Sequence, residues 1–302
     1  MSATSAVLLM AYGTPEREED ILPYYTHIRH GRPPSPEALA NLTERYRVVG
    51  GRTPLRDLTD EVARGVEAEL GTRGTPLPVY VGMKHWHPFI GDTVRRMAAD
   101  GVREVTALVL APHYSRMSIG QYRRYVDEAN ATLASPLAVR VVESWHAQPQ
   151  FVALMASLVA QGIAQFPVER RDDVLIVFTA HSLPVKIREW GDPYEQELLD
   201  SSRAVAERAG RRAWRFAWQS AGQTADPWLG PDIQEYLETL HAEGVRDVLQ
   251  VPIGFVSDHL EVLYDIDVEA KQKAASLGMR LERTALPNAR PELIRAVADA
   301  LS

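Results

Sequence analysis

The sequence of 302 residues contains no cysteine. This absence excludes disulfide bonds, cysteine nucleophiles and any zinc or iron–sulfur centre with cysteine ligands. Long apolar runs are also missing, since no stretch approaches the roughly 18–20 apolar residues that a membrane-spanning helix needs. The apolar run near the N-terminus, "AVLLMAY", has the length of a strand and follows no basic region. We therefore expect no signal peptide, no membrane span and a cytoplasmic protein.

The sequence also has no excess of positive charge, since its 40 acidic residues outnumber its 33 lysines and arginines. The formal net charge is −7, and a protein that binds nucleic acid usually needs a basic face, so we expect no nucleic-acid partner. The pattern G-x-G-x-x-G does not occur in the sequence, which disfavours a nicotinamide-dependent enzyme. With 45% hydrophobic residues, a chain of this length can form one large domain or two medium-sized domains.

Short apolar runs alternate with longer amphipathic segments along the chain. Several of the short runs are apolar throughout, which is typical of parallel strands covered on both faces. Helix-length patterns such as residues 57–70 and 193–210 lie between them. The predicted strands are residues 6–12, 78–83, 105–112, 174–180, 214–219 and 248–255. This alternation predicts an α/β fold built from doubly wound parallel sheets.

The chain contains an internal repeat. Residues 87–115 match residues 226–257, because each segment gives a proline, a glycine three residues later, a helix, the letters "GVR" and a buried strand. Duplication of one α/β half explains the match most simply, and a chance similarity of two βα units is the alternative. We predict an N-terminal Rossmann-like half of residues 1–143 and a C-terminal Rossmann-like half of residues 144–287, with a cleft between them. A last helix at about 288–302 is expected to pack on the first half.

Polar residues collect where the predicted strands end. In doubly wound folds, ligands bind outside the carboxyl ends of the strands, so both halves are expected to line one cleft. His181 directly follows the predicted strand 174–180. An imidazole there can act as a base or as a metal ligand. The sequence leaves open the alternative of a histidine that is hydrogen-bonded to nearby backbone.

Three carboxylates follow the predicted strand 248–255 at intervals of four residues. They are Glu261, Asp265 and Glu269. On an α-helix they would lie on neighbouring turns of one face, over roughly 12 Å, where like charges repel. Such an acidic ladder could pass a hydrated divalent cation inward, because hard cations prefer oxygen ligands. A solvated acidic face is the alternative.

Glu261 has two further interpretations. With Asp258 it fits the spacing of a capping box at the start of a helix. Paired with His181, it would give a nitrogen–oxygen site suited to Fe(II) or a similar metal in transit. His259 is expected to point elsewhere on the helix and to be structural.

Residues 29–56 carry a local excess of positive charge. The segment contains Arg29, Arg32, Arg45, Arg47, Arg52 and Arg56 against Glu37 and Glu44. This excess predicts a small anionic ligand that bears carboxylate or phosphate groups. A solvated basic face, or a phosphate site alone, is the alternative. Tyrosines accompany the segment, and an aromatic, cationic rim opposite a metal-handling ladder would suit a flat, polyanionic chelator.

Together these segments resemble the ferrochelatases, in particular the soluble bacterial group that acts on coproporphyrin III. The resemblance extends from near residue 8 to about residue 290. "TAHSLP" together with "DHLEVLYD" is specific in combination, whereas "YGTP" alone would be weak. The matching motifs are "LLMAYGTP", "YYTHIRHGRPP", "ERYRVVGGRTPL", "LAPHYS", "VESWH", "TAHSLP", "WQSAGQTADPWLGP" and "GFVSDHLEVLYDID".

The resemblance implies two Rossmann-like halves around a porphyrin cleft and the insertion of Fe(II) into coproporphyrin III, which gives Fe-coproporphyrin in haem biosynthesis. By motif, it implies that His181 and Glu261 are catalytic and contact the iron. Asp265 and Glu269 match the outer acidic positions of a metal-delivery path. Tyr12 matches a tyrosine that binds the iron of the product axially in this group. The implied porphyrin contacts are Tyr12, Arg29, Arg45, Tyr46, Thr53 and Tyr122.

The resemblance also indicates what the protein works with. Fe(II) and coproporphyrin III would enter as substrates, with no permanently bound cofactor, and the iron–sulfur cluster of some relatives would lack its cysteine ligands here. Transient contact with other haem-pathway enzymes is expected. The alternatives are a protoporphyrin IX ferrochelatase, a related chelatase that loads cobalt or nickel into another tetrapyrrole, and a non-catalytic porphyrin or haem carrier.

Overall fold

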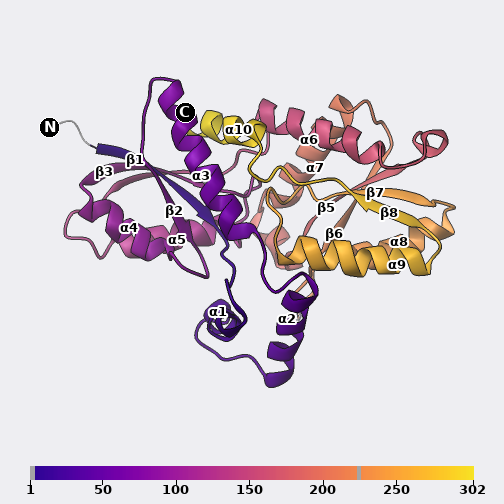
Figure 1. The fold of residues 1–302 in the computed structure, drawn as a ribbon, viewed down its shortest axis with the longest axis horizontal. Coiled ribbons are helices and arrows are strands. Elements are labelled where there is room, and N and C mark those ends of the chain that lie inside the picture. The colour runs from indigo at the N-terminus through magenta and orange to yellow at the C-terminus, as the bar shows by residue number, and fades with distance from the viewer. Residues whose placement is uncertain (1–3, 223–225) are drawn as a thin grey trace.

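The computed structural model describes residues 4–222 and 226–302. Residues 223–225, which belong to the motif "WQSAGQTADPWLGP", lie outside this range. Two four-stranded parallel sheets lie side by side (Figure 1). The strands of the first sheet are β1 (Thr4–Ala11), β2 (Val79–Met83), β3 (Val102–Val109) and β4 (Ala138–Val142). Those of the second sheet are β5 (Leu175–His181), β6 (Trp214–Gln219), β7 (Asp247–Val251) and β8 (Arg280–Arg283).

The two sheets have the same topology. Their strand orders are β2-β1-β3-β4 and β6-β5-β7-β8. The strands that end the two repeated segments, β3 and β7, therefore occupy equivalent places. The predicted α/β fold with two Rossmann-like halves is confirmed. The sequence did not reveal β4 and β8, because these edge strands are short and half-buried or exposed at most positions, so neither contains a continuous apolar run.

Helices cover both faces of the first sheet (Figure 1). They are α3 (Leu55–Thr72), α4 (Ile90–Ala99), α5 (Ile119–Asn130) and α10 (Pro291–Leu301). Successive side chains of a strand point to opposite faces. Leu8 and Met10 of β1 accordingly lie in the core formed with α4 and α5, whereas Val7 and Leu9 lie in the core that includes α3 and α10.

The second sheet is covered in the same way. Its helices are α6 (Pro149–Ile163), α7 (Tyr194–Arg208), α8 (Ile233–Ala242), the π-helix η4 (Val262–Ala270) and α9 (Lys271–Ser276). Ile176 and Phe178 of β5 face the core that includes α6 and α7. Val177, between them, faces α8 and α9. The short 3-10 helices of the chain are η1 (Glu18–Asp20), η2 (Val168–Arg170) and η3 (Val185–Trp190).

One apolar core joins the two halves. It contains Val7 of the first sheet, Phe178 of the second and Val297 of α10. The C-terminal helix α10 packs against both α3 and α6. Gly65 allows the contact with α3, because a Cβ atom at this position would overlap the side chain of Ile294. The division of the chain near residue 144 stays a prediction.

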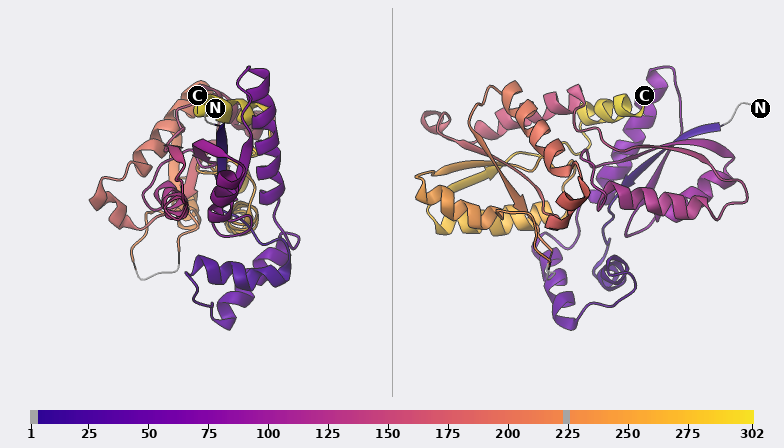
Figure 2. Two further views of the ribbon diagram at one scale, coloured as in Figure 1. Left: turned by 90° about the vertical axis from the view of Figure 1, so that its left-hand side faces the viewer. Right: turned by 180° about the vertical axis from the view of Figure 1, so that it is seen from behind.

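A helical insertion projects from the side of the molecule. It consists of α1 (Ile21–Ile28) and α2 (Pro36–Val48), which stand away from both sheets in each view (Figure 2). The α2 helix begins after Ser35, whose hydroxyl oxygen accepts a hydrogen bond of 3.2 Å from the backbone N–H of Ala38. The insertion carries the arginine-rich segment towards η4, since Arg45 of α2 contacts Asp265.

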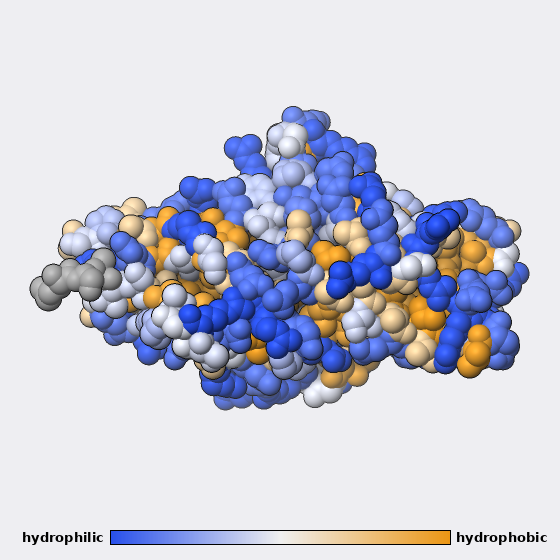
Figure 3. All heavy atoms as spheres, turned by 90° about the horizontal axis from the view of Figure 1, so that it is seen from above, coloured by the Kyte–Doolittle hydropathy of each residue, from blue (hydrophilic) through white to orange (hydrophobic). Residues whose placement is uncertain are grey.

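Hydrophilic residues cover most of the face shown in Figure 3, where hydrophobic residues form scattered patches. Within residues 4–222 and 226–302, no helix combines the length and the apolar character that crossing a membrane requires.

Candidate active site

A cavity of about 350 Å³ lies where strands of both sheets end. The first half contributes residues at or just beyond the ends of β1, β2 and β3, among them Tyr12 and Lys84, and also Tyr122 of α5. The second half contributes His181 at the end of β5, the loop after β7, and Glu261 in the first turn of the helix that follows this loop. Since the carboxyl ends of parallel strands form the binding edge of such sheets, this cavity is the predicted interdomain cleft.

His181 and Glu261 meet inside this cavity. The Nδ1 atom of His181 lies 2.5 Å from the carbonyl oxygen of Ser182. A carbonyl only accepts hydrogen bonds, so Nδ1 carries a proton and Nε2 is left to react. Nε2 lies 3.5 Å from Oε1 of Glu261. The two side chains are 30% and 34% exposed, which leaves both accessible to a ligand in the cavity.

A second histidine contacts Glu261. Nε2 of His259 lies 3.5 Å from Oε2 of Glu261, and His259 lines the same cavity. The expectation that His259 points elsewhere on the helix is wrong, because His259 precedes the helix, which begins at residue 260. Its Nδ1 donates to the carbonyl oxygen of Ser257 at 3.0 Å, which turns Nε2 towards the carboxylate.

The capping-box interpretation of Glu261 is not supported by the contacts of its partner. The Asp258 carboxylate accepts hydrogen bonds from Asn288 at 2.7 Å and from Arg283 at 3.0 Å. Both acceptor oxygens of Asp258 are therefore used, one by the last residue of β8 and one by a residue that follows it. Glu261, in turn, has both oxygens directed at histidines.

The two histidines determine the charge of the centre. Burial would raise the pKa of Glu261, but His181 and His259 hold it well below its usual range. Burial would lower the pKa of His181, but the Glu261 carboxylate raises it to about 9. At neutral pH the pair is therefore an imidazolium beside a carboxylate. The imidazolium must lose a proton before Nε2 can act as a base or bind a metal.

Two of the three carboxylates of the acidic ladder, Asp265 and Glu269, lie on the π-helix η4 rather than on the α-helix that the sequence analysis assumed, and Glu261 directly precedes it. The backbone N–H of Lys271 bonds to the carbonyl of Ile266, five residues earlier, which is the π-helical pattern. The wider turn changes the expected α-helical spacing of the carboxylates. Helical segments of this kind are rare and occur frequently at functional sites.

Asp265, the middle carboxylate of the ladder, is partly neutralised. It contacts the guanidinium of Arg45 and the hydroxyl of Ser220. Oε2 of Glu269 lies 3.9 Å from Nη2 of Arg45. Burial and the nearby Glu261 raise the pKa of Asp265 to about 6, although Arg45 and Ser220 oppose this shift. Arg45, which the resemblance assigns to porphyrin binding, is thus the counterion of the ladder in this structure.

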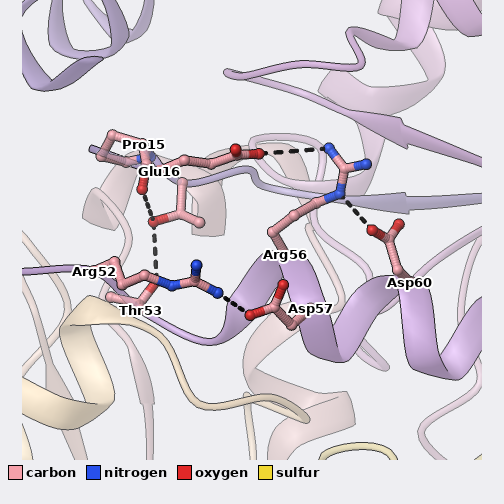
Figure 4. Close-up of a pocket in the computed structure, with 8 residues that line it drawn as sticks. Pro15, Glu16, Arg52, Thr53, Arg56, Asp57 and Asp60 are labelled. Atoms are coloured by element: carbon pink, nitrogen blue, oxygen red, sulfur yellow. Dashed lines mark hydrogen bonds and ion pairs between the residues drawn. The ribbon is translucent and has the colours of Figure 1, made fainter. Parts of the chain in front are cut away.

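Most other arginines of residues 29–56 also have acidic partners. Figure 4 shows Arg52 directed at Asp57, and Arg56 between Asp60 and Glu16, around a cavity of about 170 Å³. Arg47 pairs with Glu18 at 2.6 Å. The local excess of positive charge is therefore largely neutralised by nearby carboxylates, and little of it remains for one shared anion site.

Four of the six predicted porphyrin contacts, Arg45 among them, are not residues that line the cavity of about 350 Å³. Tyr46 and Thr53 are buried and form hydroxyl–hydroxyl contacts with Thr14 at 3.2 Å and 2.9 Å. The guanidinium carbon of Arg29 lies 5.8 Å from the ring centroid of Tyr25. The roles of Tyr46, Thr53 and Arg29 in porphyrin binding stay predictions.

Tyr12 stands beside two residues that the sequence analysis did not single out. Its ring centroid lies 4.6 Å from that of His85 and 5.6 Å from Nζ of Lys84. Burial and the Glu261 carboxylate raise the pKa of the Tyr12 phenol. Burial lowers the pKa of Lys84 to about 8, so its ammonium group is still mostly protonated at neutral pH. Lys84 and His85 both follow β2. The expectation that ligands bind at the carboxyl ends of strands, applied to the predicted strand 78–83, would have found them.

Comparison with known proteins identifies the family. The family model described as Ferrochelatase matches residues 4–302. The chain belongs to the ferrochelatase family. A ferrochelatase from Herpetosiphon aurantiacus is 50% identical over 295 residues, which cover 97% of each chain. The coproporphyrin III ferrochelatase of Bacillus subtilis is 43% identical to this ferrochelatase over 295 residues, covering 97% of this chain and 95% of the relative.

Solved structures show the same fold. SirB from Bacillus subtilis with Fe3+ has a TM-score of 0.62 to this ferrochelatase, at 10% sequence identity over 98% of this chain and 94% of SirB. The sirohydrochlorin chelatase SirB from Bacillus subtilis subspecies spizizenii, in complex with cobalt, has a TM-score of 0.60 at 10% identity, over 99% of this chain and 94% of that one. At such low identity, these matches show that the fold is shared and nothing more.

Proposed function

We propose that this ferrochelatase inserts Fe(II) into coproporphyrin III. The observation that carries the proposal is the pair of Nε2 of His181 and Oε1 of Glu261, 3.5 Å apart on the wall of the cavity. A nitrogen donor and a carboxylate oxygen suit Fe(II) in transit. Relatives at 43–44% identity that are named coproporphyrin III ferrochelatases support the choice of porphyrin. So does Tyr12, which lines the same cavity as a candidate axial ligand for the product.

The reaction exchanges two pyrrole protons for one Fe(II) ion. In this proposal, Nε2 of His181 first loses its proton, then accepts a proton from a pyrrole nitrogen as the metal enters. Glu261 receives protons from His181 and passes them to His259 on its other side, so the three residues form a proton outlet. Bending the stiff macrocycle exposes its nitrogen lone pairs. The free energy for this distortion comes from binding of the carboxylate side chains of the porphyrin, at a distance from the reacting nitrogens.

The acidic ladder is proposed to deliver the metal. Hydrated Fe(II) would meet Glu269 first, then Asp265, and would exchange water for carboxylate oxygen on the way to Glu261. The pKa of Asp265, raised to about 6, leaves this carboxylate mostly ionised at neutral pH, as a cation path requires.

Replacing Glu269 by glutamine is expected to raise KM for Fe(II) about fivefold and to leave kcat nearly unchanged. The substitution removes one charge at the outer end of the ladder, and the loss of about 1 kcal/mol of attraction corresponds to this factor. The measurement is initial rate against Fe(II) concentration under anaerobic conditions. Glu292→Gln, at an exposed position on α10, is the matched control. If KM for Fe(II) is the same in Glu269→Gln and wild type, the ladder is only an acidic surface.

The porphyrin preference is tested in one anaerobic assay. Coproporphyrin III and protoporphyrin IX are offered separately with Fe(II), and the formation of metalloporphyrin is followed by absorbance. We expect the larger kcat/KM with coproporphyrin III. A larger value with protoporphyrin IX would overturn the proposed substrate and leave the family assignment intact.

The same proposal covers the reaction partners. Fe(II) is a substrate, so no resident cofactor is required, and an iron–sulfur cluster would have no cysteine ligands in this chain. We propose that the reaction takes place in the cytoplasm, where a reducing environment would preserve Fe(II). Transient contact with other haem-pathway enzymes would supply the porphyrin and accept the product.

A further inference from the structure

Lys84 is a buried cation on the wall of the cavity that His181 and Glu261 line. It is 6% exposed, and its Nζ donates a hydrogen bond of 2.7 Å to Oε1 of Gln121. Among the residues that the structure describes, no carboxylate lies within ion-pairing distance of Lys84. A buried charge without a counterion is unfavourable, because it has lost its hydration and gained no opposite charge. A site of this kind is suited to bind an anionic group.

The backbone fixes the position of Lys84. Its N–H donates to the carbonyl of Ala11 at 2.9 Å, and the N–H of His85 donates to the carbonyl of Tyr12 at 2.8 Å. The pairing of β1 with β2 thus continues past the ends of both strands. From α5, Gln121 holds the ammonium group, which lies 5.1 Å from the ring centroid of Tyr122. An anion that binds here would meet a donor that is already in place.

Few other cationic side chains are available to a ligand inside the cavity. Of the described residues that line it, Lys84 is the only lysine or arginine. Arg45 and Arg56 of the arginine-rich segment already have carboxylate partners in Asp265 and Asp60, and Arg29 and Arg32 do not line the cavity. On the wall of the cavity, positive charge that no carboxylate compensates therefore comes chiefly from Lys84, since His181 is paired with Glu261.

We propose that Lys84, oriented by Gln121, binds one carboxylate side chain of the tetrapyrrole and so fixes the rotation of the macrocycle relative to His181 and Glu261. This inference rests on the proposed function and deepens it, since it names a group that selects carboxylate-bearing tetrapyrroles. An ammonium–carboxylate hydrogen bond in a water-poor site is stronger than a neutral one. The carboxylate would also supply the counterion that Lys84 lacks.

The test is the affinity for coproporphyrin III without iron, measured by porphyrin fluorescence. Lys84→Met keeps most of the side-chain volume and removes the charge, and we expect binding to weaken about 10- to 100-fold, the range for one charge-assisted hydrogen bond. Lys84→Arg should recover part of the affinity. Lys186→Met is the matched control, because Lys186 is 43% exposed and pairs with Asp226; its affinity should equal that of wild type.

Thermal unfolding of the ligand-free variants separates binding from a structural role. If Lys84 serves the ligand, the Tm of Lys84→Met should equal or exceed that of wild type, because a buried charge without a counterion has been removed. Wild-type affinity in folded Lys84→Met overturns the inference, and so does weaker affinity together with a lower Tm, which would give Lys84 a structural role. The proposed function is tested separately. It fails if the wild-type protein does not convert coproporphyrin III and Fe(II) into metalloporphyrin.

Discussion

Replacing His181 by alanine is expected to lower kcat for iron insertion at least about 100-fold, with little change in the affinity for coproporphyrin III. General acid–base groups contribute factors of about 10² to 10⁴, and Nε2 of His181 is the nitrogen held 3.5 Å from Glu261 for that purpose. The imidazole is not required for binding the carboxylates of the porphyrin. Anaerobic initial rates and fluorescence titration of the same protein preparation measure the two effects separately.

Two controls sharpen this prediction. His241→Ala, on α8, changes a histidine that does not line the cavity and should keep the wild-type kcat. Imidazole added to His181→Ala should restore part of the rate, since the alanine leaves space for a small base. Turnover of His181→Ala at the wild-type rate would remove His181 from the mechanism.

Replacing Glu261 by glutamine is expected to lower kcat about 10- to 100-fold and to move the pH profile. In wild type, the carboxylate raises the pKa of His181 to about 9. The base must be deprotonated to act, so kcat/KM should increase with pH until about 9. Glutamine keeps the shape but not the charge, and burial then lowers the pKa of His181. The increase in kcat/KM should therefore occur at a lower pH in the variant.

The measurement is kcat/KM for coproporphyrin III at saturating Fe(II), over the pH range in which porphyrin and metal stay in solution. Glu292→Gln provides the control for a lost surface charge and should reproduce the wild-type profile. If kcat/KM increases at the same pH in Glu261→Gln and in wild type, one of two conclusions follows. Either His181 is not the group whose deprotonation controls kcat/KM, or Glu261 does not set the pKa of His181.

The pairing of His181 with Glu261 could be predicted from the sequence because it follows from sheet topology. His181 is the last residue of β5, and Glu261 lies in the first turn of the helix that follows β7, the parallel neighbour of β5. Parallel strands end at the same edge of a sheet, so a histidine at the end of one and a glutamate in the segment after the other come together. The same rule applied to β2 would have found Lys84 and His85.

Other features depend on contacts between distant parts of the chain and could not be predicted. Arg45 and Asp265 are 220 positions apart, and only the folded arrangement of α2 and η4 brings them together. The π-helical turn has no local signature, because the same residues fit an α-helix by propensity. The prediction for His259 was wrong for a related reason. The direction of its side chain depends on whether the helix begins before or after this residue, and the boundaries of elements are the least predictable feature of a sequence.

The central proposal is that His181 and Glu261 form a catalytic centre for metal insertion, and the most direct test counts turnovers. Coproporphyrin III and Fe(II) are each supplied in large excess over wild-type enzyme under anaerobic conditions, and metalloporphyrin is followed by absorbance. We expect many equivalents of product per enzyme, formed at a rate that His181→Ala and Glu261→Gln both reduce. Saturation at one equivalent would contradict catalysis and indicate a porphyrin or haem carrier.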